Sequence, residues 1–194
     1  MAVAYSFNSF SSSLLFLLPL FLSISLSTSD LIADICFTAD DQQLCSQTLR
    51  SDPRSARADL KGLALIAIDI AKSIAKQTAK HLIPALSKGT TDSILKGRYD
   101  TCAKNYRTAI DDLSEARKAL KARDMATFRV VTSGAFTGQA TCDNRFDYEG
   151  APAESKQLRD ANNKLKGLCE TLGDIGKRLG GNKGVYADLT PVSL

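Results

Sequence analysis

The sequence predicts an all-α protein, an up-down-up-down four-helix bundle preceded by a short helical hairpin that a disulfide closes. The strongest indication is a heptad seam, in which small and apolar residues recur at spacings of four and three. Its members are Cys102, Tyr106, Ala109, Leu113, Ala116 and Leu120. Three further stretches repeat apolar residues at helical spacing, and the chain has neither an alternating strand pattern nor an internal repeat.

The first 29 residues contain no charged side chain and include an apolar, serine-containing run from Leu14 to Leu26. Small residues follow this run, as cleavage by a signal peptidase requires. We therefore expect residues 1–29 to be a secretory signal peptide, although the usual Lys or Arg before the run is missing. The alternative is a membrane anchor, for which the run is short and rich in Ser.

All charged side chains follow residue 29, where basic and acidic residues alternate and no block of five like charges occurs. The net charge of +4 therefore indicates a mixed, solvated surface rather than one that binds nucleic acid. No second long apolar run follows the first, so we expect no membrane association once the signal peptide is removed.

The segment 30–50 is expected to form the hairpin, with two short helices, LIADIC and QQLCSQTL, joined by a polar TADD turn. The bundle is expected over 51–180. Its first helix should begin in SDPRSA, with Ser or Asp as the cap and a Pro in the first turn. This helix should weaken near Pro84 and end by Lys88 and Gly89. Its buried stripe is predicted to be Leu60, Leu63, Ala64, Ala67, Ile70, Ala71, Ile74, Thr78 and Leu82.

The heptad seam lies in the second helix, which should begin near Thr91 or Asp92. The third helix should follow Asp124, with one stripe formed by Phe128, Val131, Ala135 and Cys142. After a loop at 145–152, the fourth helix should bury Leu158, Ala161, Leu165, Leu168, Leu172, Ile175 and Leu179. Gly180 should stop this helix. The remaining residues, 181–194, lack periodicity and are expected to form a flexible tail.

Five cysteines in a secreted chain suggest two disulfides and one thiol left over. The spacings suggest a local Cys36–Cys45 bond and a long-range Cys102–Cys142 bond between neighbouring helices. Cys169 would then be a buried, inert thiol. A zinc site is the alternative, but the chain has no CxxC pair and a single histidine.

No arrangement of catalytic residues is visible in the sequence. His81 lies beside Lys80 near the end of a predicted helix, which is typical of a surface residue rather than of a catalytic base. Asp111 and Asp112 are adjacent on a helix, so their side chains diverge instead of meeting at one site. The residues therefore favour a binding protein or an inhibitor over an enzyme, without a metal or other cofactor.

Several motifs are characteristic of one family. Cys36 and Cys45 form C-x8-C, and Cys102 precedes NY and AID and pairs by spacing with Cys142. Together with SDPRSA, DLKGL and LKGRYDTC, these motifs resemble the plant invertase/pectin methylesterase inhibitor family, and the pectin methylesterase inhibitor branch in particular. The resemblance extends over residues 31–179.

The resemblance implies a four-helix bundle with these same two disulfides, secreted into the plant cell wall (the apoplast). It implies a non-covalent, one-to-one complex in which the bundle covers the pectin-binding cleft of a pectin methylesterase, above the enzyme's paired catalytic carboxylates. Such binding modulates the de-esterification of cell-wall pectin. The interface should be on the order of 1,600 Å², and a rigid surface with few side chains to order would favour it.

The matching motifs also imply candidate contacts with the target enzyme, each of which is otherwise an ordinary surface residue. They are Lys96 and Tyr99 in KGRY, Asp111 in AID, Asp124 before the third helix, and Thr141. The chain lacks acids that related inhibitors carry at the positions of Lys104, Thr108 and Asn144. We therefore expect a flatter pH dependence of binding than in those relatives, set largely by Asp111 and Asp124.

Two other functions remain open. Invertase inhibitors of the same family often carry Pro-Lys-Phe near the start of the third helix, where this chain reads DMATFRVV. Acid invertase is therefore the second candidate target. A binder of a small apolar ligand is the third possibility, and it would require an apolar pocket of a few hundred Å³.

Overall fold

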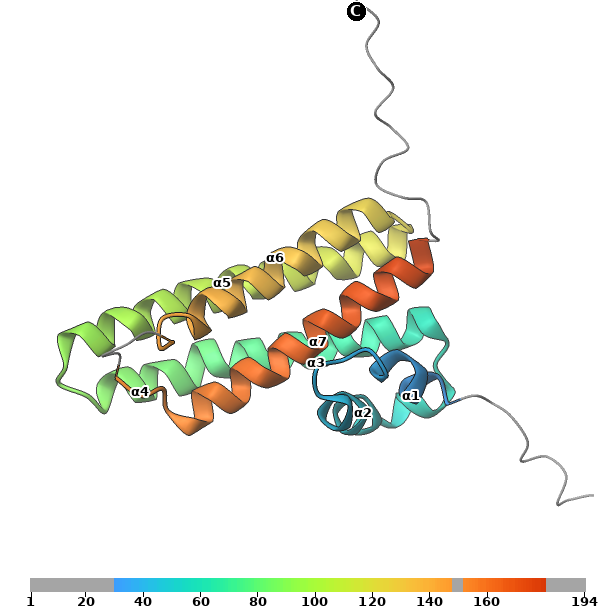
Figure 1. Cartoon of the computed structure of the whole chain (residues 1–194). Helices are drawn as coiled ribbons and strands as arrows, with labels where there is room; N and C mark the ends of the chain where they lie inside the picture. The colour runs from blue at the N-terminus through green and yellow to red at the C-terminus, as the bar shows by residue number, and fades with distance from the viewer. Residues whose placement is uncertain (1–29, 148–151, 181–194) are drawn as a thin grey trace, which may run out of the picture. The chain divides into compact units, whose positions relative to one another are not determined.

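The computed structural model describes residues 30–147 and 152–180, and every regular element in them is helical (Figure 1). The elements are α1 (Leu31–Cys36), α2 (Gln42–Arg50), η3 (Pro53–Arg57), α3 (Leu60–Gln77), η4 (Thr78–Leu82), α4 (Ile83–Lys88), α5 (Ser93–Ala122), α6 (Met125–Asp143) and α7 (Lys156–Gly180). None of these described helices is both long and apolar enough to cross a membrane. The expected signal peptide and C-terminal tail lie outside the described residues.

The bundle consists of α3 with its continuations η4 and α4, followed by α5, α6 and α7. Each unit packs against the next one in sequence, and α7 completes the ring by packing on α3. Since short connections make successive helices antiparallel, the predicted up-down-up-down arrangement is confirmed. Large, fully buried side chains fill the centre, including those of Leu63, Tyr106, Leu113, Phe128 and Leu165.

The first bundle helix does not begin in SDPRSA, so that prediction was wrong. Asp52 caps only the 3₁₀ turn η3, where its side chain accepts a hydrogen bond from the backbone N–H of Arg54 at 2.9 Å. Ala58 then takes an extended conformation, with φ −79° and ψ 136°. A second cap, Asp59, accepts from the N–H of Gly62 at 2.7 Å and starts α3. Two aspartate caps in quick succession therefore divide what the apolar spacing presented as one helix.

The expected weakening near Pro84 takes the form of a π-helical turn, η4. Pro84 has no N–H to donate to the carbonyl four residues earlier, so the α-helical ladder is interrupted there. The N–H of Ile83 instead donates to the carbonyl of Thr78, five residues back. A π turn absorbs the irregularity without ending the helix, and the chain continues as α4 to Lys88.

Two polar residues lie in the core at positions next to the predicted apolar stripes. Thr132 is buried while Val131 is half-buried, and Asn162 is fully buried while Ala161 is half-buried. Thr132 satisfies its hydroxyl within α6 by donating to the carbonyl of Phe128 at 2.9 Å. A pattern that counts only apolar residues misses such positions.

The hairpin of α1 and α2 is closed by the Cys36–Cys45 disulfide. It packs against α7 and makes polar contacts with it. Lys166 pairs with Asp40 at 2.8 Å, and the hydroxyl of Thr38 donates to Asp174 at 2.7 Å. A third contact is the ion pair between Arg178 and Asp34. Because these contacts are exposed, they orient the hairpin more than they stabilise it.

Candidate functional site

α5 and α6 approach each other closely because small residues and a disulfide line their contact. Cys102 and Cys142 are bonded across it with their Cα atoms 4.6 Å apart. A Cβ atom at Gly138 would lie 3.1 Å from the carbonyl oxygen of Asn105, so any larger residue there would press on the backbone of α5. The two helices therefore form a continuous outer surface. We call it the α5–α6 face, and it extends from Lys96 and Thr141 at one end to Asp124 at the other.

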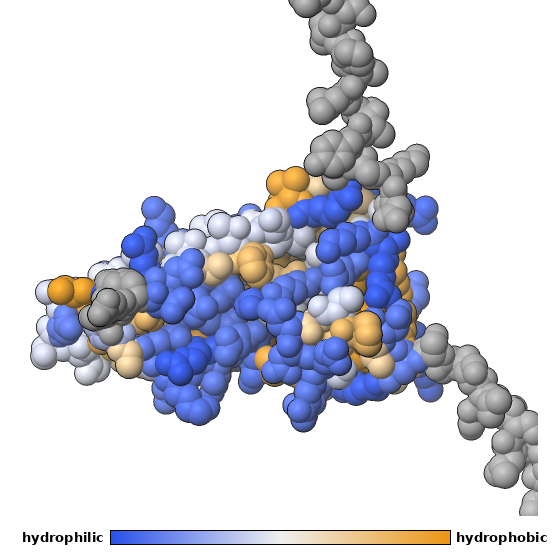
Figure 2. Space-filling model, viewed as in Figure 1, coloured by the Kyte–Doolittle hydropathy of each residue, from blue (hydrophilic) through white to orange (hydrophobic). Residues whose placement is uncertain are grey.

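The part of this face that belongs to α6 carries no charge. No charged residue occurs from Val130 to Cys142, although Val130, Ser133 and Thr137 are exposed and Thr141 is half-exposed. Figure 2 shows pale residues along the upper edge of the molecule, where α5 and α6 lie in this view, with strongly hydrophilic residues over α7 below. A centre depleted of charge with a polar rim is typical of protein–protein interfaces.

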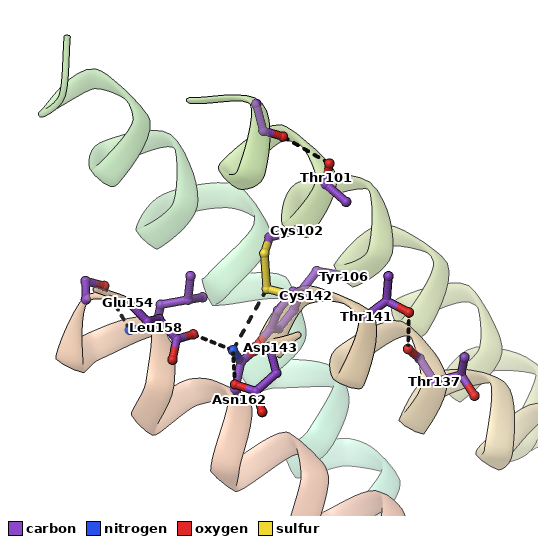
Figure 3. Close-up of a disulfide and its surroundings, with 12 residues drawn as sticks. Thr101, Cys102, Tyr106, Thr137, Thr141, Cys142, Asp143, Glu154, Leu158 and Asn162 are labelled. Carbon is purple, nitrogen blue, oxygen red and sulfur yellow. Dashed lines mark hydrogen bonds between the residues drawn. A yellow bond between two sulfur atoms is a disulfide. The ribbon is translucent and has the colours of Figure 1, made fainter. Parts of the chain in front are cut away.

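The threonines of this strip have fixed side chains. Thr137 donates its hydroxyl to the carbonyl of Ser133 at 3.0 Å, and Thr141 donates to the carbonyl of Thr137 at 2.8 Å (Figure 3). The hydroxyl protons of both threonines are engaged by carbonyls of their own helix. Each threonine therefore presents its methyl group and the lone pairs of its hydroxyl oxygen outward. The strip therefore has little side-chain entropy to lose on binding and offers acceptors to a partner's donors.

The structure separates the five predicted contact residues along the face. α5 has 30 residues, about 45 Å of helix, with Lys96 near its start and Asp111 in its middle. Thr141 lies beside the disulfide, at a level along the bundle axis between those of Lys96 and Asp111. Asp124 lies at the opposite end of the face, where it caps α6. Lys96, Asp111 and Thr141 are therefore close enough for one standard interface, and Asp124 could contact only its edge.

Tyr99 differs from the other four because it is 4% exposed. Its ring packs on Phe146 with the ring centroids 6.0 Å apart, and the guanidinium of Arg98 lies 5.9 Å from the same Phe146 ring. Tyr99 therefore supports the segment after α6 and has almost no surface with which to contact a partner. The sequence could not indicate this, because Phe146 lies outside any periodic pattern.

The two aspartates of the AID motif are not equivalent. Asp111 is exposed, whereas Asp112 is half-buried and lies against the backbone of α6 at Gly134. Burial raises the pKa of Asp112, and the negative charge of Asp111 adds to this shift. Hydrogen bonds from Thr127 lower the pKa of Asp124 below its usual range, so this carboxylate stays ionised in mildly acidic medium.

A buried polar network supports the disulfide end of the face (Figure 3). The hydroxyl of Tyr106 donates to Asn162 Oδ1 at 2.7 Å, and Asn162 Nδ2 donates to Glu154 Oε1 at 2.6 Å. The same Nδ2 lies 3.4 Å from Asp143 Oδ1, so two carboxylates share one amide donor. Arg159, whose Nε lies 3.5 Å from Glu154 Oε2, supplies the opposing charge.

This network moves the pKa of Glu154 into the neutral range. Burial raises its pKa to about 7, the charge of Asp143 adds to the shift, and Arg159 opposes it. Because the folded pKa exceeds the unfolded value, the folded state binds the proton more tightly. Protonated Glu154 therefore stabilises the folded state. This contribution to stability is complete below the unfolded pKa of 4.5 and is lost as the pH rises through the folded pKa of about 7. Glu154 lines a surface groove together with Asp143 and Asp147, so further acidic side chains lie near it.

We therefore expect Glu154→Gln to remove most of the decline in stability between pH 5 and 8. The wild type should lose on the order of 1–2 kcal/mol relative to the variant over this range, after allowance for solvent screening. Calorimetric melting at several pH values measures the difference. Glu115→Gln is the matched control, since the side chain of Glu115 is 47% exposed and pairs with Lys118 at the surface. Parallel curves for wild type and Glu154→Gln would contradict the assignment.

The described residues contain no arrangement suited to catalysis or metal binding. His81 is exposed on η4, and no group of three His, Cys, Asp or Glu side chains that could hold a metal is present there. Cys169 is a buried free thiol, and burial raises its pKa to about 12. A thiol of this kind does not act as a nucleophile at neutral pH.

The structure gives little support to a binder of small apolar ligands, because side chains fill the bundle centre. A groove of about 470 Å³ lies between α6, α7 and the turn after α1. Its lining includes five charged side chains, those of Asp40, Arg129, Glu170, Asp174 and Lys177. Such a groove is not the apolar pocket that this alternative requires.

Comparison with known proteins relates the chain to plant inhibitors. The sequence model of the family described as plant invertase/pectin methylesterase inhibitor matches residues 30–174. A pectinesterase inhibitor from Actinidia deliciosa is 43% identical over 88% of this chain and 91% of its own length. Cell wall / vacuolar inhibitor of fructosidase 2 from Arabidopsis thaliana is 31% identical over 87% of this chain and 98% of its own length.

A solved structure shares the fold. The crystal structure of mutant form A of a pectin methylesterase inhibitor from Arabidopsis aligns with a TM-score of 0.66 and 26% sequence identity. The alignment covers 75% of this chain and 94% of the other. The bundle described above is therefore the architecture of an inhibitor of this kind.

Proposed function

Since the chain belongs to the plant invertase/pectin methylesterase inhibitor family, we propose that it inhibits a plant pectin methylesterase by docking its α5–α6 face on the enzyme. The family and the similar relatives are inhibitors rather than enzymes, and the partner is correspondingly an enzyme. The complex is non-covalent and one-to-one, and it blocks pectin from the enzyme's cleft.

The proposal rests mainly on the uncharged strip of α6, which lies beside the exposed Asp111 of α5. The threonine side chains of this strip are held in fixed rotamers by hydrogen bonds within the helix. Ser133, Thr137 and Thr141 offer acceptors and small apolar groups on a backbone that a disulfide holds. Lys96 at one end supplies a rim charge. Such a surface loses little conformational entropy on binding, which is what a tight rigid-body inhibitor requires.

Pectin methylesterase is favoured over acid invertase as the target for two reasons. The pectinesterase inhibitor from Actinidia deliciosa is more similar to this chain, at 43% identity, than the fructosidase inhibitor, at 31%. The Pro-Lys-Phe motif of invertase inhibitors is also absent from the start of α6.

Titration of the protein against both enzymes tests this choice. We expect stoichiometric inhibition of a plant pectin methylesterase and no more than weak inhibition of an acid invertase at the same concentration. Size-exclusion chromatography of the mixture should give a one-to-one complex. Inhibition of invertase alone would instead place the chain in the other branch of its family.

The pH dependence of binding is expected to be flatter than in relatives with more acids. Lys104, Thr108 and Asn144 supply no carboxylate to the face, and Asp124 stays ionised because hydrogen bonds from Thr127 lower its pKa. Asp111 and, behind it, Asp112 are then the carboxylates of the face whose protonation would relieve repulsion against an acidic cleft of the enzyme.

Dissociation constants from about pH 5 to 7 for the wild type and for Asp111→Asn measure this dependence. The variant should bind several-fold more tightly at neutral pH and show a smaller slope. Asp124→Asn should leave the slope unchanged, which revises the expectation that both aspartates contribute. An unaltered affinity and slope in Asp111→Asn would remove Asp111 from the interface.

We also propose that residues 1–29 direct secretion to the cell wall and that residues 30–180 form the inhibitor domain of the mature protein. The two disulfides of the structure suit an oxidising compartment. Secretion of a fluorescent fusion of the full chain, compared with one that lacks residues 1–29, would test the assignment.

A further inference from the structure

The helical unit of α3, η4 and α4 carries more net positive charge than α5 or α7. The continuous stretch of α3, η4 and α4, from Leu60 to Lys88, contains five lysines and a single acid, Asp69. Its net charge is +4, against +3 for α5, +3 for α7 and −3 for residues 30–59. The charges that alternate along the sequence are therefore not evenly mixed in space.

Three of these lysines lie in a row, which we call the lysine row: Lys72, Lys76 and Lys80. They follow one another at intervals of four residues, so they project from one side of the helix about 6 Å apart along its axis. The π turn η4 keeps Lys80 on that side, because its wider turn still returns after four to five residues. Lys76 and Lys80 are exposed, and Lys72 is half-buried at the foot of the row.

The lysine row is not neutralised by the rest of the described protein. No ion pair or hydrogen bond engages the amino groups of Lys72, Lys76 or Lys80 with described residues. The nearby acid, Asp69, has both oxygens occupied, Oδ1 by Arg117 and Oδ2 by Arg54.

Three of the four lysines of α7 provide a contrast within the same molecule. Lys156 pairs with Asp160 at 2.7 Å, Lys166 with Asp40 at 2.8 Å, and Lys177 with Asp174 at 2.8 Å. These three lysines are therefore neutralised locally, whereas the lysine row presents an uncompensated positive field.

The lysine row and the α5–α6 face are separate surfaces. In the bundle α3 packs on α5 and α7, whereas α6 occupies the diagonal position (Figure 1). The outer side of α3 therefore faces away from the uncharged strip of α6, and one molecule can engage a partner on each.

We propose that the lysine row binds a linear carbohydrate polyanion that carries regularly spaced carboxylates, the chemistry of de-esterified pectin. The identity of this partner rests on the proposed function, because removal of methyl esters from pectin exposes such carboxylates next to the enzyme. A row of evenly spaced ammonium groups complements a chain of evenly spaced carboxylates, and it cannot recognise the neutral methyl ester. The inhibitor is thereby retained where its target has been active.

The composition of the row favours carboxylates over nucleic-acid phosphates. It contains lysines alone, without the arginines that grip phosphates with two parallel hydrogen bonds. No aromatic residue occurs in α3, so the stacking platforms of single-strand binding proteins are absent from it.

Affinity electrophoresis of the full-length mature protein through gels that contain pectate tests the proposal, with highly methyl-esterified pectin and duplex DNA as comparisons. The variant combines Lys72→Gln, Lys76→Gln and Lys80→Gln. The control combines Lys156→Gln, Lys166→Gln and Lys177→Gln, which removes the same charge from α7. Runs at roughly 0.05 M and 0.15 M salt measure the electrostatic contribution, and melting curves confirm that both variants fold.

We expect the wild type and the α7 control to be retarded by pectate within about twofold of each other, and the row variant to lose about tenfold or more in affinity. Retardation should weaken with salt and be absent with the esterified polymer. An equal loss of pectate affinity in both variants would show that binding depends on net charge alone, and it would overturn the proposal. Equal binding to esterified pectin, or to DNA at matched charge, would overturn the assignment to a carboxylate polymer.

Inhibition of pectin methylesterase by the same proteins separates the two proposals. The row variant should inhibit as well as the wild type, since the lysine row lies off the α5–α6 face. Full inhibition without pectate binding would refute the lysine row alone. Pectate binding through the row without any inhibition would refute the proposed function and leave the carboxylate-binding surface standing.

Discussion

Removing the Cys102–Cys142 disulfide should lower the free energy of unfolding by about 4 kcal/mol and the melting temperature by roughly 10 °C. The bond closes a sequence separation of 40 residues, so its loss restores much conformational freedom to the unfolded chain. Both sulfurs are fully buried between α5 and α6, and the double variant Cys102→Ala/Cys142→Ala avoids a stray thiol. Calorimetry measures the change.

The control is Cys36→Ala/Cys45→Ala, which opens a separation of only 9 residues and should cost about 3 kcal/mol at most. A peptide map under non-reducing conditions should link Cys102 to Cys142 and leave Cys169 alone, because burial holds that thiol protonated. A link from Cys169 to either partner, or a smaller loss for the long loop than for the short one, would contradict this account.

Thr137→Arg should weaken inhibition of pectin methylesterase by about 100-fold, or ~2.7 kcal/mol. Thr137 is exposed and bonds only to its own helix, so the substitution leaves the fold intact. On the enzyme-bound strip, however, the long cation would displace close contacts and lose its hydration without a partner. Inhibition constants measured by enzyme titration give the effect.

Ser73→Arg is the matched control, since Ser73 is likewise an exposed, small hydroxyl residue but lies on α3. It should inhibit like the wild type. If Thr137→Arg also inhibits normally, the strip of α6 does not form the centre of the interface.

The sequence predicts the bundle well because its main signal is physical periodicity. The heptad seam of α5, from Cys102 to Leu120, is buried at every predicted position. Periodicity fails where a polar group is satisfied by tertiary contacts. Asn162 enters the core because Tyr106 and Glu154, which are distant in sequence, complete its hydrogen bonds. No local pattern contains that information.

The candidate site is only partly visible in the sequence. Motif matching finds Asp111 and Thr141, which the structure leaves accessible on neighbouring helices, but it also selects Tyr99, which Phe146 covers. It overlooks Ser133 and Thr137, although an uncharged run within a surface helix was a readable signal. The lysine row is likewise hidden, because the residues that neutralise other lysines are their neighbours only after folding.

Hydrogen–deuterium exchange of the protein with and without a plant pectin methylesterase tests the central claim most directly. The account predicts that the enzyme protects peptides of α6 between Val130 and Thr141 and of α5 around Asp111. Peptides of α3 that contain Lys76 should exchange at the same rate in both states. Protection confined to α3 or to the hairpin of α1 and α2, with α6 unchanged in a complex that inhibits the enzyme, would contradict it.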